Sequence, residues 1–175
     1  MDKEELNGIM EYEYKRINEE GKDILNFGIK INIENNDYRK WEIILKAPED
    51  SDYKGAQYTL IAEFLLEYPL VNPKFKFKSH FYHCNVDDEG NLKVNWLLKG
   101  MKIDYILPRL LTLFYLQDTS ANKDSERSKL YENDKEQFME NVKKNVEENK
   151  CDWIKYTKLY IYIYFNILKI AFDYF

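Results

Sequence analysis

Apolar and polar residues alternate in four successive segments of the chain. In residues 24–34 (ILNFGIKINIE) every second side chain is apolar, which is typical of a strand with one buried face. Three further segments favour strands: 41–47 (WEIILKA), 56–66 (AQYTLIAEFLL) and 74–79 (KFKFKS). Turn-forming runs such as ENNDYRK and PEDSDYKG separate the first three. Consecutive strands with short connections predict an antiparallel meander.

Helical spacing is found on both sides of these strands. In residues 2–20 apolar positions recur at steps of three and four, as in a helix with one apolar face. Residues 105–117 (YILPRLLTLFYLQ) predict a buried helix with Pro108 in its first turn, where its missing N–H is harmless. Residues 128–150 predict a longer amphipathic helix. We therefore expect an α+β domain over residues 1–150: a four-stranded antiparallel meander with an N-terminal helix, and C-terminal helices on one face.

Composition narrows the classes of function. The chain has 175 residues, of which 45% are hydrophobic, enough to form a core. Its formal net charge is −5, which argues against nucleic acid as a partner, because affinity for nucleic acid depends on clustered positive charge. Its two cysteines, Cys84 and Cys151, suggest no disulfide framework and favour an intracellular location, cytoplasmic or nuclear. The longest uncharged apolar stretch near the C-terminus, LYIYIYFNIL, is too short for a transmembrane span, which needs about 20 residues.

Residues 151–175 form an aromatic-rich C-terminal extension that is expected to be helical. On a helix its polar residues would form a narrow stripe on an otherwise apolar surface. Three interpretations stay open: docking on its own domain, self-association or partner binding, and contact with a membrane surface. The run YIYIYF would also suit a strand. The aromatic residues are Trp153, Tyr156, Tyr160, Tyr162, Tyr164, Phe165, Phe172, Tyr174 and Phe175.

The segment FYHCNVDDEGNLKVNWL, residues 81–97, shows neither strand nor helix periodicity in its apolar residues, and it contains the candidate functional residues. His80, His83 and Cys84 form an H-x-x-H-C run, but a zinc site normally needs four ligands and no second Cys/His pair is present. We therefore predict no metal and no cofactor. His83 and Asn85 lie between the sheet and the next helix, where each can hydrogen-bond backbone groups that would otherwise be unpaired.

Several motifs in this order resemble those of the ubiquitin-conjugating enzyme family. The stretch WEIILKAPEDSDYKGAQYTLIAEFLLEYPLVNPKFKF is similar to the family's second to fourth strands, with their Trp, Tyr-Pro and Pro-Lys. The HCN of residues 83–85 is similar to the family's His-Pro-Asn loop. The resemblance covers roughly residues 5–150 and implies the ubiquitin-conjugating fold. It also implies that Asn85 matches an asparagine proposed to stabilise the oxyanion of acyl transfer, which suits a fixed amide donor.

The resemblance places the family's nucleophilic cysteine eight positions after this asparagine, where the chain has Lys93. Gly90, Leu92 and Leu97 support that alignment without an insertion. A conjugating enzyme carries its modifier as a thioester, which needs a thiolate that can attack and leave again. A lysine amine is mostly protonated at pH 7, and an amide that it formed would not transfer further. Cys84, at the proline position of the motif, is the alternative nucleophile.

The resemblance also implies partner surfaces. The family's ligase-binding loops align with Leu70 and with the Lys-Ile-Asp run around Ile103, so Leu70 and Ile103 are candidate binding residues. The family's first helix usually offers basic residues to the activating enzyme, whereas residues 2–20 here carry an excess of acidic ones. Such a helix would repel an acidic partner.

Three functions are consistent with these residues. The first is a catalytically inactive variant that acts as a binding module or cofactor in ubiquitin or ubiquitin-like conjugation. Its partners would be an active ubiquitin-conjugating enzyme, ubiquitin, or a ubiquitin-like modifier. The second is an active conjugating enzyme that uses Cys84, with Asn85 as oxyanion donor. The third is a scaffold of this fold that has left the modifier pathway.

Overall fold

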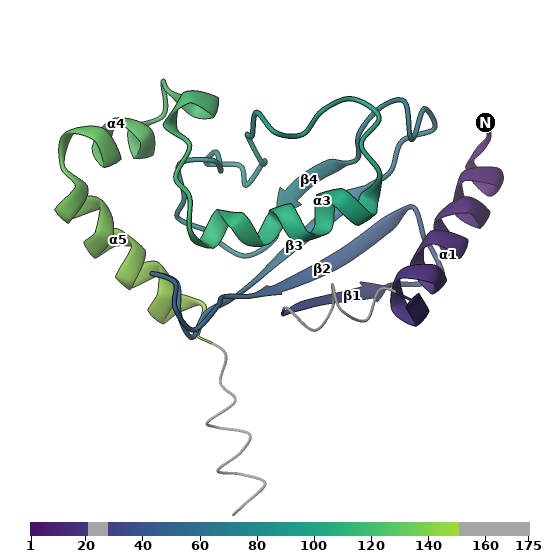
Figure 1. The fold of residues 1–175 in the computed structure, drawn as a ribbon, viewed down its shortest axis with the longest axis horizontal. Coiled ribbons are helices and arrows are strands. Elements are labelled where there is room, and N and C mark those ends of the chain that lie inside the picture. Colours follow the sequence, from purple (N-terminus) through teal and green to yellow (C-terminus); the bar gives the residue numbers. More distant parts are fainter. Residues whose placement is uncertain (21–27, 151–175) are drawn as a thin grey trace, which may run out of the picture.

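The computed structural model describes residues 1–20 and 28–150 (Figure 1). The chain begins with a helix, passes through four strands and an irregular segment, and continues in helices. The elements are α1 (Lys3–Glu20), β1 (Ile29–Ile33), β2 (Lys40–Lys46), β3 (Gln57–Glu63), β4 (Lys74–Phe77), α3 (Ile103–Leu110), the 3-10 helices η1 (Leu111–Phe114) and η2 (Thr119–Asn122), α4 (Glu126–Asn133) and α5 (Lys135–Glu148).

The four strands form one antiparallel sheet in the order β1-β2-β3-β4. Along β2, Trp41, Ile43 and Leu45 are buried, while the residues between them are exposed or half-buried. Successive side chains of a strand point to opposite faces, so the sheet has a buried inner face and an open outer face. The predicted α+β fold with a four-stranded meander is confirmed.

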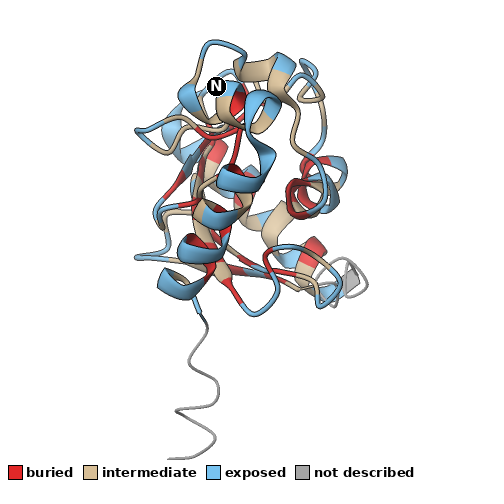
Figure 2. Ribbon diagram, turned by 90° about the vertical axis from the view of Figure 1, so that its left-hand side faces the viewer, coloured by how far each residue is buried: buried red, intermediate tan, exposed pale blue. Residues whose placement is uncertain are grey.

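The helices supply the other side of the core. In Figure 1, α3 crosses in front of the sheet, α1 lies at one end, and α4 and α5 lie at the other. Ile106 and Leu107 of α3, and Phe138 and Val142 of α5, are fully buried. Figure 2 shows the buried residues running through the strands and the inward sides of the helices. Each such side chain stabilises the fold by about 1.5–3 kcal/mol, so this core holds the loops around it in place.

Two predicted helices differ from the structure. The single helix expected over 128–150 is two, because Asp134 leaves the helical conformation with φ −147° and caps α5 by accepting from the Gln137 N–H at 3.0 Å. The helix expected over 105–117 begins at Ile103 and ends at Leu110, where η1 continues the chain. Pro108 is therefore the sixth residue of α3, not a first-turn residue, and it leaves the Asp104 carbonyl without its usual intrahelical donor.

Some expectations lie outside the described residues. They include the helix and the self-association expected of 151–175, and the part of the first strand at 24–27. The domain boundary at residue 150 likewise stays a prediction. Within residues 1–20 and 28–150, no helix is both long enough and apolar enough to span a membrane.

Candidate functional site

A turn at Gly90 fastens the loop after β4 to the sheet. Gly90 has φ +87°, and a Cβ at this position would lie 2.6 Å from the Phe77 carbonyl oxygen, so only glycine fits. The Gly90 carbonyl accepts a hydrogen bond from the Phe77 N–H at 2.7 Å. The turn returns the chain so that the Lys93 N–H donates to the Asn85 carbonyl at 2.8 Å. The local sequence therefore brings the motif asparagine and residue 93 together.

The buried Asn85 side chain uses both ends of its amide. Its Nδ2 donates to the carbonyls of Lys93 at 2.8 Å and Asp118 at 2.9 Å, and its Oδ1 accepts from the Asp118 N–H at 3.0 Å. These bonds join the loop at residue 93 to the segment that follows η1. Both amide protons are committed, so stabilising an oxyanion would require one of these bonds to open.

His83 is fully buried and holds the loop from inside. Its Nδ1 accepts from the Asn85 N–H at 2.9 Å, so the proton lies on Nε2, which donates to the Leu113 carbonyl at 2.8 Å. Burial lowers the pKa of His83 to about 4, although the bond to Leu113 opposes this shift. The ring is therefore neutral at pH 7, and its contacts are structural.

The free energy of unfolding is expected to decrease between pH 6.5 and pH 5 because of His83. The unfolded ring binds a proton near its ordinary pKa of 6.5 and the folded ring only near 4, so the unfolded state holds more protons in this window. The contribution of His83 to the free energy of unfolding is fully present only well above pH 6.5. It is reduced by roughly 2 kcal/mol at pH 5 and continues to decrease until the pH passes 4. Urea unfolding across this range measures the slope.

His80→Gln is the matched control for this measurement, because it removes the chain's other histidine, which is exposed. The slope should persist in that variant. The pKa values of Asp37 and Asp87 are lowered from 3.8 and that of Glu42 from 4.5, so these carboxylates add to the loss of stability mainly below pH 5, under the range measured here. A free energy of unfolding that stays constant from pH 6.5 to 5 would contradict the buried neutral ring.

Lys93 is paired with a carboxylate that sequence reasoning did not single out. Its Nζ lies 3.2 Å from Asp87 Oδ2, and the Lys93 and Asp87 side chains are 45% and 19% exposed. Asn91 donates to Asp87 through its N–H at 2.7 Å and its Nδ2 at 2.9 Å. Burial would raise the pKa of Asp87, but the bonds from Asn91 and Lys93 outweigh it and lower that pKa. At residue 93, the position expected to correspond to the nucleophile, the structure therefore has a lysine facing an ionised carboxylate.

The Cys84 thiol is enclosed. Cys84 is 0% exposed, and its Sγ lies 3.7 Å from the Arg127 carbonyl oxygen. Gln117 Oε1 accepts from the Cys84 N–H at 3.0 Å, and Asn122 Nδ2 donates to the Cys84 carbonyl at 3.0 Å. Burial raises the pKa of the Cys84 thiol to about 11. Reactive cysteines have accessible thiols with lowered pKa values, and Cys84 has neither property.

The H-x-x-H-C run does not converge on one point. His80 Nδ1 lies 3.1 Å from Glu148 of α5, whereas His83 bonds to Leu113 in the interior. In the part of the chain that the structure describes, no three His, Cys, Asp or Glu residues are grouped so that they could hold a metal ion.

The two candidate binding residues have different environments. Leu70 is 69% exposed, and the nearby Leu98 is 63% exposed. Asn72 Nδ2 donates to the Leu98 carbonyl at 2.9 Å, which holds the two loops side by side. Ile103 is only 1% exposed, because it opens α3 and packs in the core. This corrects the expectation for Ile103: the apolar side chain that the second loop exposes is Leu98.

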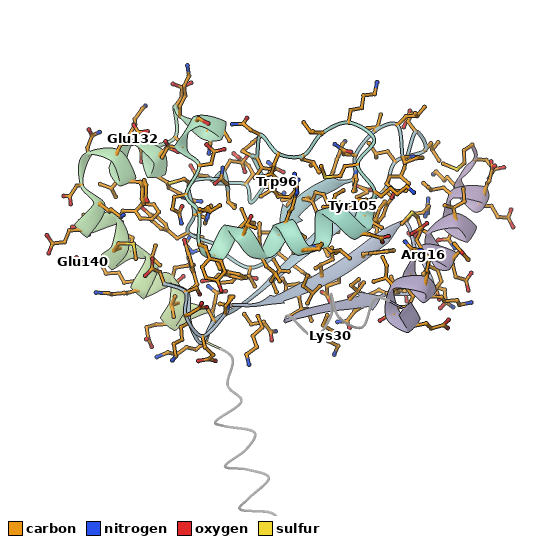
Figure 3. The ribbon with its side chains drawn as sticks, viewed as in Figure 1. Arg16, Lys30, Trp96, Tyr105, Glu132 and Glu140 are labelled. Atoms are coloured by element: carbon orange, nitrogen blue, oxygen red, sulfur yellow. The ribbon has the colours of Figure 1, made fainter. Side chains whose placement is uncertain are left out.

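The two cations near the end of α1 both have carboxylate partners. Arg16 donates to both oxygens of Asp104, at 2.7 and 2.8 Å, and also pairs with Glu13. Lys15 pairs with Glu11 at 2.7 Å. In Figure 3, Arg16 lies on α1 at the side of the molecule where α3 begins. The pair with Asp104 therefore joins α1 to α3, and neither cation is left without a carboxylate.

Sequence reasoning missed three residues of this site: Asp87, Gln117 and Asp118. Asp87 lies in a run that reads only as a turn, and Gln117 and Asp118 follow a helix without a recognisable motif. Gln117 also donates to the Tyr53 hydroxyl at 2.9 Å, so it links the loop to the core. Only an unusual polar pair directly after a buried helix could have drawn attention to positions 117 and 118.

Comparison of the sequence with known proteins gives one matching family and several relatives. The family described as "Ubiquitin-conjugating enzyme" matches residues 10–146, which include the strands, the loop with Asn85 and Lys93, and most of the C-terminal helices. A ubiquitin-conjugating enzyme E2 of African swine fever virus (strain Badajoz 1971 Vero-adapted) is 32% identical over 137 residues, covering 69% of this chain and 64% of the viral protein. The chain therefore spans less than two thirds of that relative.

Two further relatives come from another virus and from a plant. A probable ubiquitin-conjugating enzyme E2 of Acanthamoeba polyphaga mimivirus is 27% identical over 146 residues, covering 81% of this chain and 92% of that protein. A probable ubiquitin-conjugating enzyme E2 of Arabidopsis thaliana is 28% identical over 107 residues, covering 59% of this chain and 70% of the plant protein.

Proposed function

Because the chain belongs to the ubiquitin-conjugating enzyme family, we propose that it is a non-catalytic member that works by binding. Its partners are an active conjugating enzyme, ubiquitin, or a ubiquitin-like modifier. The observation that carries this proposal is the Lys93–Asp87 pair beside Asn85, at the position where the resemblance expects a nucleophilic thiol. Neither side chain of that pair can form a thioester.

The environment of Cys84 supports the same proposal. A displaced nucleophile would have to reach the thioester of an activating enzyme, yet Cys84 is wholly buried and its pKa is raised to about 11. Exposing the thiol would also break the contacts of its backbone with Gln117 and Asn122. These contacts favour the non-catalytic proposal over the alternative in which Cys84 is the nucleophile.

The exposed loops offer a surface for a binding role. Leu70 and Leu98 present large apolar side chains on neighbouring loops that Asn72 holds together. A fixed pair of exposed leucines is suited to contact an apolar pocket on a partner. The paired cations Lys15 and Arg16 weaken the electrostatic attraction that the family's first helix usually provides for the activating enzyme.

A charging assay tests the proposal. The unaltered chain, mixed with activating enzyme, ATP and ubiquitin, is expected to form no adduct that a reductant cleaves, because no described thiol is accessible. Gels run with and without reductant report the adduct, and a known active conjugating enzyme serves as the positive control. Titration of the labelled chain with ubiquitin or that enzyme then measures binding, which Leu70→Asp should weaken.

Cys84→Ser and Cys151→Ser separate the possible outcomes. A reductant-sensitive adduct in the unaltered chain that disappears in Cys84→Ser would overturn the proposal and make Cys84 the nucleophile. An adduct that disappears only in Cys151→Ser would overturn it as well, in favour of a thiol outside the described residues. Absence of both charging and binding would point to a scaffold outside the modifier pathway.

A further inference from the structure

Lys93 combines an accessible amine with a fixed backbone. Its side chain is 45% exposed. Its backbone is bonded to Asn85 in both directions: the Lys93 N–H donates to the Asn85 carbonyl at 2.8 Å, and the Lys93 carbonyl accepts from Asn85 Nδ2 at 2.8 Å. These bonds leave the long side chain free to meet a molecule that approaches from solvent. The amine is therefore held in one region of the surface without being enclosed there.

The carboxylate that faces this amine is fixed as well. Asp87 Oδ2 lies 3.2 Å from Lys93 Nζ, and the Asp87 side chain is only 19% exposed. Asn91 donates to both Asp87 oxygens, through its N–H at 2.7 Å and its Nδ2 at 2.9 Å. Asp87 is ionised at pH 7. The structure therefore keeps an oriented proton acceptor beside the Lys93 amine.

An amine and a thioester react in one direction. The neutral amine attacks the carbonyl carbon, the carbon–sulfur bond breaks, and the sulfur leaves as a thiolate. Positive charge develops on the nitrogen during the attack, and a carboxylate within hydrogen-bond reach stabilises this charge and accepts the proton. The product is an amide, which a thiol does not cleave, so the acyl group is not passed on.

We propose that Lys93 is a covalent acceptor of the modifier. Its Nζ forms an isopeptide bond with the C-terminal carbonyl carbon of ubiquitin or a ubiquitin-like modifier, and the thiolate of the enzyme that carried the modifier leaves. The Lys93 ammonium loses one proton to solvent before the attack, and Asp87 receives the second proton afterwards. The inference rests on the proposed function, because the active partner supplies the thioester on its own cysteine.

The surroundings favour a single, slow transfer. Both Asn85 amide protons are bonded to the carbonyls of Lys93 and Asp118, so Asn85 offers no free donor to an oxyanion. The Cys84 thiol is enclosed and cannot take the modifier back. The isopeptide is therefore the end product. It would hold the modifier on the same loop as the exposed Leu98, which raises its effective concentration for a partner that binds there.

The test uses the full chain with ubiquitin as the probe. The chain is incubated with activating enzyme, ATP, ubiquitin and a known active conjugating enzyme. Gels run in reductant report the adduct, and tryptic mass spectrometry locates the modified lysine. One reductant-resistant adduct at Lys93 is expected. Lys93→Arg should reduce its amount at least about tenfold, because a guanidinium keeps its charge and does not act as a nucleophile.

Lys78→Arg is the matched control, because Lys78 is also an exposed amine beside a largely covered carboxylate. Its Nζ lies 2.8 Å from Glu42 Oε1, and the two side chains are 57% and 18% exposed. Lys78 follows β4 and is not bonded to the loop at Asn85 in the described structure. This variant should leave the amount of adduct within about twofold. Thermal melts of both arginine variants verify that they fold.

Asp87→Asn tests the proton acceptor. The change makes the Lys93 amine easier to deprotonate, which accounts for about a tenfold gain if its pKa falls by one unit. It also removes a general base, whose contribution is about 10²–10⁴-fold. The second effect is larger, so the adduct should form at least about tenfold more slowly, as measured by its initial rate. An unchanged or faster rate would exclude Asp87 from the step.

The remaining outcomes separate this inference from the proposed function. Absence of a reductant-resistant adduct, in a chain that still binds ubiquitin or the active enzyme, would overturn the acceptor role alone. An adduct that persists in Lys93→Arg, or that lies equally on Lys78, would overturn it as well and would mean unselective modification of exposed lysines. A reductant-sensitive adduct would instead overturn the proposed function.

Discussion

Lys93→Cys is expected to change a chain that forms no reductant-sensitive adduct into one that is charged with ubiquitin. The backbone at residue 93 is held by two bonds to Asn85, and the side chain at this position is 45% exposed, so a thiol here would be both placed and accessible. The same gel assay with activating enzyme and ATP measures the adduct. The substitution should be made in a Cys84→Ser background, so that only one described thiol remains.

The carboxylate of Asp87 makes this prediction quantitative. Once Lys93 is removed, Asp87 faces the new thiol, and a neighbouring negative charge raises the pKa of a thiol. Adding Asp87→Asn should therefore shift the pH dependence of charging to lower pH by about one unit, roughly a tenfold gain in thiolate at pH 7. Lys93→Ala in the same background is the control and should give no adduct.

Two results would contradict this expectation. If Lys93→Cys forms no adduct at any pH, recognition of the activating enzyme has been lost as well as the nucleophile. The first residues to test for that loss would be Lys15 and Arg16 of α1, which are paired with carboxylates. If Asp87→Asn leaves the pH profile unchanged, the carboxylate does not face residue 93 in solution.

Asn85→Ala is expected to reduce the free energy of unfolding by about 4 kcal/mol. The change removes three hydrogen bonds from a side chain that is 1% exposed, and it leaves the Asp118 N–H without its Asn85 partner. Denaturant unfolding measures the loss. This is a stability effect in a protein without a catalytic thiol at residue 93, so it would assign Asn85 a structural role independent of acyl transfer.

Asn95→Ala is the matched control, because Asn95 is exposed and bonds to the side chains of Asp118 and Ser120 on the same segment. It should cost no more than about 0.5–1 kcal/mol. If Asn85→Ala is no more destabilising than Asn95→Ala, the bonds that Asn85 makes across the loop do not hold this part of the fold together.

The elements and the family could be predicted from sequence because their signals are local. A period of two marked the four strands, and steps of three and four marked α1. Spacing along the chain also predicted the position of Lys93 relative to Asn85. Because the turn at Gly90 between them is short, the two residues are close in the structure as well, and the Lys93 N–H donates to the Asn85 carbonyl. The errors were local too: Asp134 can cap a helix as well as continue one, and periodicity does not separate the two.

The character of each site residue was decided by tertiary structure. The Cys84 thiol is enclosed because Arg127 and Gln117, more than thirty positions further along the chain, pack around Cys84. The Asn85 amide is occupied because Asp118 packs beside it, and Ile103 is lost as a contact residue because α3 buries it. Burial and hydrogen bonding depend on neighbours that are distant in sequence, and no pattern within one segment contains them.

The outer face of the sheet shows both contributions together. Alternation along each strand determined that its lysines point away from the core, and this could be read from the sequence. Only the register of the sheet decided that Lys76 lies beside Ile61, and that Glu42 and Glu63 pair with Lys78 and Lys40. Chain periodicity thus determined which residues share a face, whereas pairing between strands decided which charges meet, because cross-strand neighbours are set by hydrogen-bonded register.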